Sequence, residues 1–94
     1  MRLGIDSMND EERMRRLKAW WKYHFRVCRL KRWYREYSTL VISSGVLELE
    51  EYETIEYYKR EIVDACNEAE IATQRLFGMS YHDMKTVVPS PRSR

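Results

Sequence analysis

The hydrophobic and polar positions of the chain follow the period of an α-helix in two long segments. Residues 14–42 and 47–77 contain no Gly or Pro, and their apolar residues recur every three or four positions. Acidic residues lie just before the first segment, at 10–12, and near the start of the second, at 48–53, where the helix dipole favours negative charge. Glycine readily adopts the left-handed conformation that ends helices, so Gly45 and Gly78 predict where the two helices stop.

Only a few residues join the two predicted helices, which favours an antiparallel helical hairpin and an all-α fold class. The C-terminal segment contains both prolines of the chain and several serines, a composition typical of disorder. The predicted divisions are a flexible segment 1–7, a hairpin domain 8–78 with a helix at 8–43, a turn at 43–47 and a helix at 47–77, and a disordered tail 79–94.

One alternative concerns the predicted turn. Residues 38–52 place β-branched side chains beside a Ser-Ser-Gly sequence and then alternate apolar and acidic positions. That pattern is also typical of a short β-hairpin, which would separate the two helices.

Each predicted helix has one broad apolar side. On the first helix this side consists of Leu17, Trp20, Trp21, His24, Val27, Cys28, Tyr34 and Ile42. The second helix has a seven-residue repeat with intervening apolar positions, made of Ile55, Tyr58, Ile62, Ala65, Ala69, Ala72 and Leu76. In the predicted hairpin the small residues Ala69 and Ala72 lie level with the tryptophan pair 20–21. Small residues facing large ones fill a core, so both tryptophans are predicted to be core residues.

The apolar sides are wider than a contact between two helices requires. A chain of 94 residues buries only about two thirds of its unfolded surface, so further burial would stabilise it. We therefore expect a homodimer whose two hairpins form a four-helix bundle, or docking on a larger protein.

The net charge of +2 conceals an uneven distribution. Residues 8–43 contain ten Lys or Arg and four acidic residues, whereas residues 46–78 contain nine acidic and three basic residues. The outer side of the first helix carries a basic stripe of Lys18, Lys22, Arg26 and Arg29, with Arg15 and Trp33 beside it. Aligned cations contact phosphates and an exposed Trp stacks on bases, so nucleic-acid binding is the alternative function. A helix of this kind also suits an anionic membrane surface, although the acidic second helix opposes that interpretation.

The second helix carries an acidic stripe of Glu50, Glu53, Glu61, Asp64 and Glu68, interrupted by Tyr57. Aromatic residues on a charged face are informative, because solvation does not require them and interfaces often do. Trp33 and Tyr57 are predicted to lie at the same height on the hairpin, with Tyr37 one turn further along. The predicted partner-binding site therefore combines aromatic and acidic residues, namely Trp33, Tyr37, Tyr57, Glu53 and Glu61. Such an acidic face also suits an inhibitor that imitates nucleic-acid phosphates.

Candidate chemistry is sparse. The sequence lacks a nucleophile elbow, a glycine-rich phosphate loop and a metalloprotease motif, so we predict no enzyme activity, no cofactor and no metal site. The nearest approach to a zinc site combines His24, Cys28, Cys66 and His82, but their spacing is unlike a zinc finger. Cys28 and Cys66 are instead expected to be inert buried thiols, with a disulfide as the alternative.

One set of residues permits an enzyme interpretation. Cations and a carboxylate fall toward the apolar sides of both helices, and small helical enzymes bind anionic substrates among such groups; the set is Arg13, Lys31, Arg35, Glu51 and Lys59. A polar layer that fixes helix register is the simpler interpretation.

The sequence as a whole favours a non-enzymatic interaction or regulatory protein that acts on a larger protein. Two widely spaced cysteines and the lack of a long apolar run predict a cytoplasmic protein that does not span a membrane.

Overall fold

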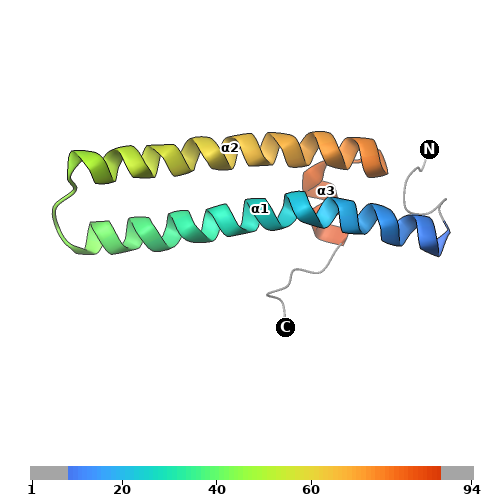
Figure 1. Cartoon of the computed structure of the whole chain (residues 1–94), viewed down its shortest axis with the longest axis horizontal. Coiled ribbons are helices and arrows are strands. Elements are labelled where there is room, and N and C mark those ends of the chain that lie inside the picture. Colours follow the sequence, from blue (N-terminus) through green and yellow to red (C-terminus); the bar gives the residue numbers. More distant parts are fainter. Residues whose placement is uncertain (1–8, 88–94) are drawn as a thin grey trace.

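The structure, a computed structural model, describes residues 9–87 and is all-helical over that range. Two long antiparallel helices, α1 (Asp10–Ser43) and α2 (Leu49–Phe77), pack side by side, and a short helix, α3 (Tyr81–Val87), lies across one end of the pair (Figure 1). The predicted helical hairpin is confirmed, and the alternative β-hairpin is wrong because residues 38–52 contain no strand. Dimerisation stays a prediction.

Local signals explain where the long helices begin and end. The Asn9 side chain accepts a hydrogen bond of 2.7 Å from the Glu12 amide and so caps α1. Gly45 follows α1 with a φ of 87°, and Gly78 ends α2 with a φ of 67° while its amide donates to the Gln74 carbonyl. Both glycines adopt the left-handed conformation that the sequence predicts for them. The predicted N-terminal segment 1–7 lies outside the described residues.

The prediction of a disordered tail over 79–94 is wrong for its first part, because that part contains α3. The Ser80 hydroxyl caps this helix by accepting from the Asp83 amide at 3.1 Å, and Glu70 of α2 accepts from the Tyr81 amide at 3.0 Å. Tyr81 and Met84 are buried against the hairpin. Their burial supplies the stabilisation that a seven-residue helix lacks on its own. Residues 88–94 lie outside the described range.

The main core lies where the three helices meet. Trp20 of α1 is fully buried there, and its indole nitrogen donates a 2.8 Å hydrogen bond to the Thr73 hydroxyl, which in turn donates to the Ala69 carbonyl. The predicted packing of Trp20 against the alanines of α2 is thus confirmed. The core cluster consists of Trp20, Val27, Leu30, Ala65, Ala69, Phe77, Tyr81 and Met84.

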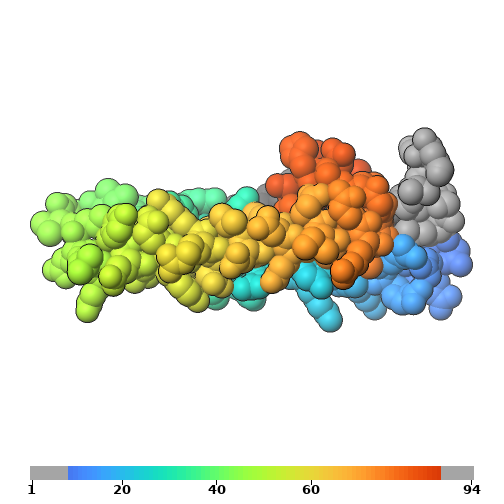
Figure 2. Space-filling model, turned by 90° about the horizontal axis from the view of Figure 1, so that it is seen from above, coloured from blue at the N-terminus to red at the C-terminus, as the bar shows by residue number. Residues whose placement is uncertain are grey.

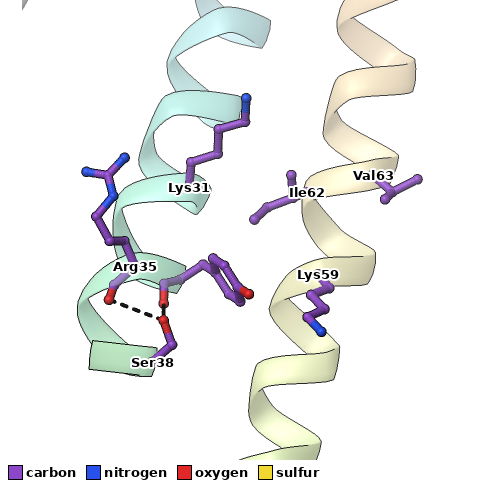
Figure 3. Close-up of a pocket in the computed structure, with 7 residues that line it drawn as sticks. Lys31, Arg35, Ser38, Lys59, Ile62 and Val63 are labelled. Atoms are coloured by element: carbon purple, nitrogen blue, oxygen red, sulfur yellow. Dashed lines mark hydrogen bonds between the residues drawn. The ribbon is translucent and has the colours of Figure 1, made fainter. Parts of the chain in front are cut away.

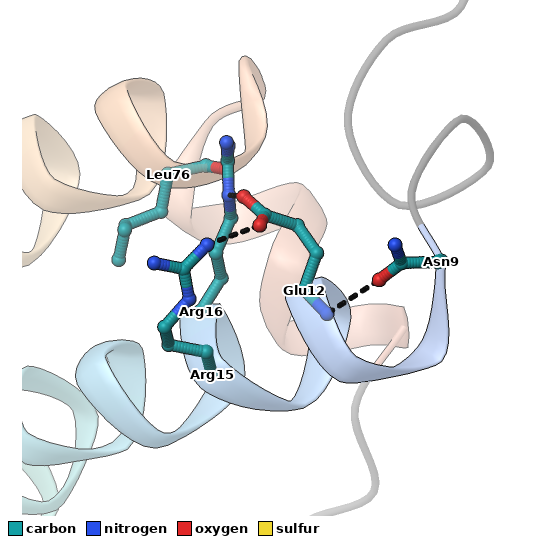
Figure 4. A network of polar contacts seen from close by, with 5 residues as sticks. All are labelled: Asn9, Glu12, Arg15, Arg16 and Leu76. Carbon is teal, nitrogen blue, oxygen red and sulfur yellow. Dashed lines mark hydrogen bonds and ion pairs between the residues drawn. The ribbon is translucent and has the colours of Figure 1, made fainter.

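Polar contacts fasten α1 to the end of α2. The Arg16 guanidinium donates a 2.6 Å hydrogen bond to the Leu76 carbonyl, one of the last carbonyls of α2, which have no partner within the helix (Figure 4). Glu12 positions this group by pairing with Arg16 at 2.7 Å and with Arg15. These arginines hold the pKa of Glu12 below its ordinary value, through hydrogen bonds first and their charge second.

The other end of the hairpin, which we call the turn half (residues 30–63), has no third helix. Ile42 is 66% exposed although the sequence places it on the core side, and Val41 is buried in its place. Leu30, another buried residue, is missing from the predicted apolar side. Only three of the thirteen buried residues lie in the turn half, compared with nine of the fourteen large apolar residues that are exposed. The two halves therefore differ in how completely their apolar surface is covered.

Candidate functional site

The hairpin has two opposite faces, which two nearby residues of α1 distinguish. Arg26 and Cys28 are two positions apart, so they point about 200° apart around the helix axis. Cys28 lies on the side where α3 packs, because its sulfur is 3.6 Å from His24 Nε2 and His24 Nδ1 is 2.7 Å from the Tyr81 hydroxyl. Arg26 lies on the other side. We call these sides the α3 face and the far face.

Arg26 joins the two helices on the far face. Its guanidinium pairs with Glu61 at 3.1 Å and with Glu68 at 3.2 Å, both across the hairpin on α2. The predicted basic stripe therefore loses Arg26, and the predicted partner site loses Glu61, to contacts within the chain. The acidic stripe is likewise partly neutralised, which leaves Glu50, Glu53 and Asp64 as its carboxylates outside any ion pair within residues 9–87.

Aromatic rings collect next to this ion pair. The Tyr58 ring is 6.0 Å from the Tyr37 ring on α1 and 5.9 Å from the Tyr57 ring on α2. The structure thus links Tyr37 and Tyr57 through Tyr58, a residue that the sequence assigned to the core. Trp33 is 43% exposed, and the Arg29 guanidinium carbon lies over its ring, 5.4 Å from the ring centre. Tyr57 is similarly accessible, at 51%.

Glu53 is the remaining member of the predicted partner site. It is exposed, and it precedes Tyr57 by four residues, so both side chains lie on one stripe of α2. We define the aromatic surface as Trp33, Tyr37, Tyr57 and Glu53. It offers large rings edged by negative charge, the kind of composition that protein interfaces favour.

A groove lies on the opposite side, the α3 face. Its volume is about 620 Å³, and side chains of both long helices line it: Lys31, Tyr34, Arg35, Ser38, Lys59, Ile62 and Val63. Figure 3 labels Lys31, Arg35 and Ser38 on α1 and Lys59, Ile62 and Val63 on α2, and it shows Ile62 directed toward α1. The groove is therefore an apolar channel between two helices with three cations along its margins.

The cations of the groove differ in their partners. Lys59 pairs with Glu56 at 3.1 Å, and this contact raises the pKa of Lys59 above its ordinary value. Neither Lys31 nor Arg35 forms an ion pair within the described part of the chain. The Ser38 hydroxyl is engaged, since it donates to the Tyr34 carbonyl at 2.7 Å. The groove thus presents an excess of positive charge.

The enzyme interpretation is only partly matched by this geometry. Lys31, Arg35 and Lys59 do line one groove, whereas Arg13 pairs with Asp10 at 3.0 Å and Glu51 accepts from the Glu48 amide at the start of α2. No carboxylate lines the groove. A groove with cations and hydroxyls is suited to binding an anionic group.

The cysteines and His24 form a separate cluster under α3. Cys28 and Cys66 are both free thiols, so the alternative of a disulfide is wrong. Cys28 is exposed and Cys66 is only partly buried, so the expectation of two buried thiols is also wrong. Burial, together with the charges of Lys85 and Lys31, lowers the pKa of His24 below its ordinary value. Burial likewise raises the pKa of Tyr81. Over residues 9–87 the structure has no group of three or more His, Cys, Asp or Glu able to hold a metal ion.

Sequence reasoning named the three cations of the groove but not the groove itself. Tyr34 and Ile62 were assigned to the apolar sides of their helices, and Ser38 and Val63 were not singled out. The available signal is spacing: Lys31, Arg35 and Ser38 recur at intervals of four and three, which places them on one stripe of a helix. That stripe becomes one wall of a groove only once the register with α2 is known.

Comparison with known proteins adds no relative. No family model, no curated protein and no solved structure matches the chain. Within residues 9–87, none of the three helices is long and apolar enough to cross a membrane.

Proposed function

We propose that this chain is a non-enzymatic interaction protein that binds a larger protein through the aromatic surface of its turn half. The partner that fits carries an apolar patch edged by Lys or Arg. Trp33 and Tyr57 fill the patch, and the carboxylate of Glu53 faces the basic edge.

The accumulation of exposed apolar side chains in the turn half carries this proposal. Leu40, Val46 and Leu49 are each at least two-thirds exposed, in addition to the exposed rings of the aromatic surface. Single exposed apolar residues are common on soluble proteins, but a concentration at one end of a short chain is typical of an interaction site. The Arg26 pairs stabilise the hairpin beside the rings, so a partner meets a surface that is already ordered.

The experiment is affinity capture from the source cell with the full chain and two variants, Trp33→Ala and Tyr57→Ala. We expect wild-type chain to retain one protein that both variants lose, because truncating an interface aromatic weakens binding by about 2 kcal/mol or more. Phe25→Ala is the matched control, since Phe25 is half-exposed on the outer side of α1 and outside the aromatic surface.

Thermal unfolding of each variant separates binding from folding. The two variants should unfold near the wild-type temperature because neither ring is buried. If both variants, unfolding at that temperature, still retained every protein that the wild type captures, the aromatic surface would not be the binding site.

One observation favours nucleic-acid binding as a second candidate function. Phe25 is exposed among Lys18, Lys22 and Arg29, and Arg29 covers the face of Trp33. Cations alternating with accessible rings along one helix suit single-stranded nucleic acid, whose phosphates and bases they contact. Arg26 does not contribute to this surface, because Glu61 and Glu68 hold it.

Fluorescence anisotropy with a labelled single-stranded oligonucleotide tests this candidate. The Lys18→Gln/Lys22→Gln double variant should weaken binding and reduce its salt dependence, whereas Tyr57→Ala should leave both unchanged. Absence of binding at about 50 mM salt would exclude the candidate, since counterion release is strongest there.

A further inference from the structure

The α3 face changes along its length from covered to open. In the covered part, Tyr81 and Met84 of α3 are buried on the hairpin. In the open part, the groove of Lys31, Arg35, Lys59 and their neighbours lies between the same two helices. Figure 2 shows α3 standing out from the hairpin at one end only.

The covered and open parts belong to one continuous channel. On α1, His24 contacts Tyr81 of α3 and Cys28 lies beside His24. Lys31 and Arg35 continue the same stripe at spacings of three and four residues. On α2, Cys66 lies close enough to Tyr81 to affect its pKa, and Val63 and Lys59 continue that stripe. The channel that receives one helix of this chain therefore extends into the groove.

We propose that the groove binds an acidic amphipathic helix of a partner protein, on the same face of the hairpin that receives α3. Its apolar side packs on Tyr34, Ile62 and Val63, as Tyr81 and Met84 of α3 pack further along. Its carboxylates, on the two flanks, pair with the cations at the groove margins. This inference rests on the proposed function, because it assigns a partner's segment to the same half of the molecule, but it uses the opposite face.

Charge selects this occupant over the alternatives. The groove has three cations, and the single carboxylate paired with them is Glu56, bound to Lys59. A second copy of this chain, packed face to face, would bring two sets of these cations together and so would oppose its own binding. The cations of the groove would repel a basic helix. A nucleic acid is attracted by these cations, but it has no apolar side to pack on Ile62 and Val63.

Size also favours a helix. The wall from Lys31 to Ser38 covers eight residues, or about 10 Å of helix, and the seven-residue α3 has nearly the same length. Two or three turns of a partner helix would cover the groove. In helix-in-groove binding of this kind, the bound helix inserts apolar residues spaced three and four apart, and its flanking charges set specificity.

The test uses two synthetic helical peptides of about 18 residues with the same Leu and Ile stripe. One carries Glu on both flanks and the other carries Lys. Binding to the full chain is measured by fluorescence anisotropy at a fixed ionic strength. We expect wild-type chain to bind the Glu peptide at least tenfold more tightly than the Lys peptide.

Charge reversal then locates the site. The Lys31→Glu/Arg35→Glu variant should prefer the Lys peptide, whereas Lys18→Glu/Lys22→Glu, which makes the same change of charge on the outer side of α1, should retain the preference for the Glu peptide. Trp33→Ala and Tyr57→Ala should leave peptide binding unchanged, so this result is independent of the capture experiment. Circular dichroism confirms that each variant remains helical.

Three results would overturn the proposal. The first is wild-type chain that binds neither peptide or does not distinguish them. The second is a control variant that reverses preference as completely as the groove variant, which would mean that net charge alone governs binding. The third is a stable dimer, shown by light scattering, whose groove is closed to both peptides, because the occupant would then be a second copy.

Discussion

The two halves of the hairpin are built from the same two helices, but α3 covers the apolar side chains of only one half. At the end where α3 packs, Trp20 is wholly buried, and its hydrogen bond to Thr73 satisfies the one polar atom of its ring. In the turn half, the Tyr58 ring lies next to both the Tyr37 ring and the Tyr57 ring, and Tyr57 stays half-exposed. Similar aromatic content thus gives a core in one half and a surface in the other.

The difference shows what a third helix contributes. Two helices in contact bury only the residues that face each other, and a helix laid across them covers a second side of both. Seven residues of α3 are enough to complete a core around Trp20. The same two helices without that cover leave apolar side chains available for another molecule.

The largest expected effect is on the covered half. Trp20→Ala should lower the free energy of unfolding by about 3–5 kcal/mol, because it empties the centre of the core. Tyr57→Ala should cost about 1 kcal/mol or less, as for other exposed positions. Urea unfolding followed by circular dichroism measures both. Equal losses of stability from the two variants would show that Trp20 is no more important to the folded core than Tyr57.

The next effect tests whether α3 belongs to the core. Met84→Ala should destabilise the chain by about 2–5 kcal/mol, since the side chain is fully buried. Val87→Ala, in the same helix but more than half exposed, should change stability by about 0.5 kcal/mol or less. A Met84→Ala chain as stable as the wild type would mean that α3 does not contribute to the folded core.

A smaller effect should appear with pH. The folded-state pKa of His24 is below its unfolded value of about 6.5, because burial and nearby lysines disfavour the charged ring. The unfolded chain therefore binds the proton more tightly, and stability present above pH 6.5 should fall as the pH drops through that value. Urea midpoints at pH 7.5 and 5.5 measure this loss. In His24→Gln the difference between the two midpoints should shrink; an unchanged difference would assign the effect to other groups.

The smallest effect concerns the link between the helices on the far face. Arg26→Gln removes both ion pairs, and because these groups are partly exposed we expect a loss of about 0.2–1 kcal/mol. The loss should decrease at high salt, where screening weakens the pairs. Arg32→Gln, on the exposed side of the same helix, serves as the reference. A loss that is the same at low and high salt would indicate packing of the Arg26 stem instead.

The parts of this fold that were predictable are those determined by short-range signals. Gly45 and Gly78 mark the ends of α1 and α2 because few other residues adopt their backbone conformation easily. The packing of Trp20 against Ala69 follows from helix period and hairpin register, both of which can be counted along the chain.

The missed elements depend on contacts between distant residues. The signal for α3 is present, since Ser80 and Asp83 have the spacing of a helix cap and Tyr81 and Met84 lie on one side. A seven-residue helix is not stable by itself, so only its contact with His24 and the core distinguishes it from a loop. The prolines that follow it made disorder the natural prediction for the whole tail.

Side-chain partners across the hairpin were the least predictable. Arg26 has Glu61 and Glu68 within reach only because the rotation of both helices about their axes directs all three to one face. A small rotation would have left Arg26 in the basic stripe and Glu61 in the aromatic surface. The sequence therefore predicts which residues are charged on each helix but not which of them neutralise one another.

The burial of Trp20 beside the exposure of Trp33 also provides the molecule with internal fluorescence probes. An indole in a dry, hydrogen-bonded site emits at shorter wavelength than one in contact with water. With Trp21 and Trp33 replaced by Phe, emission would report the opening of the core around α3. With Trp20 and Trp21 replaced instead, the emission of Trp33 would report the binding of another molecule to the turn half.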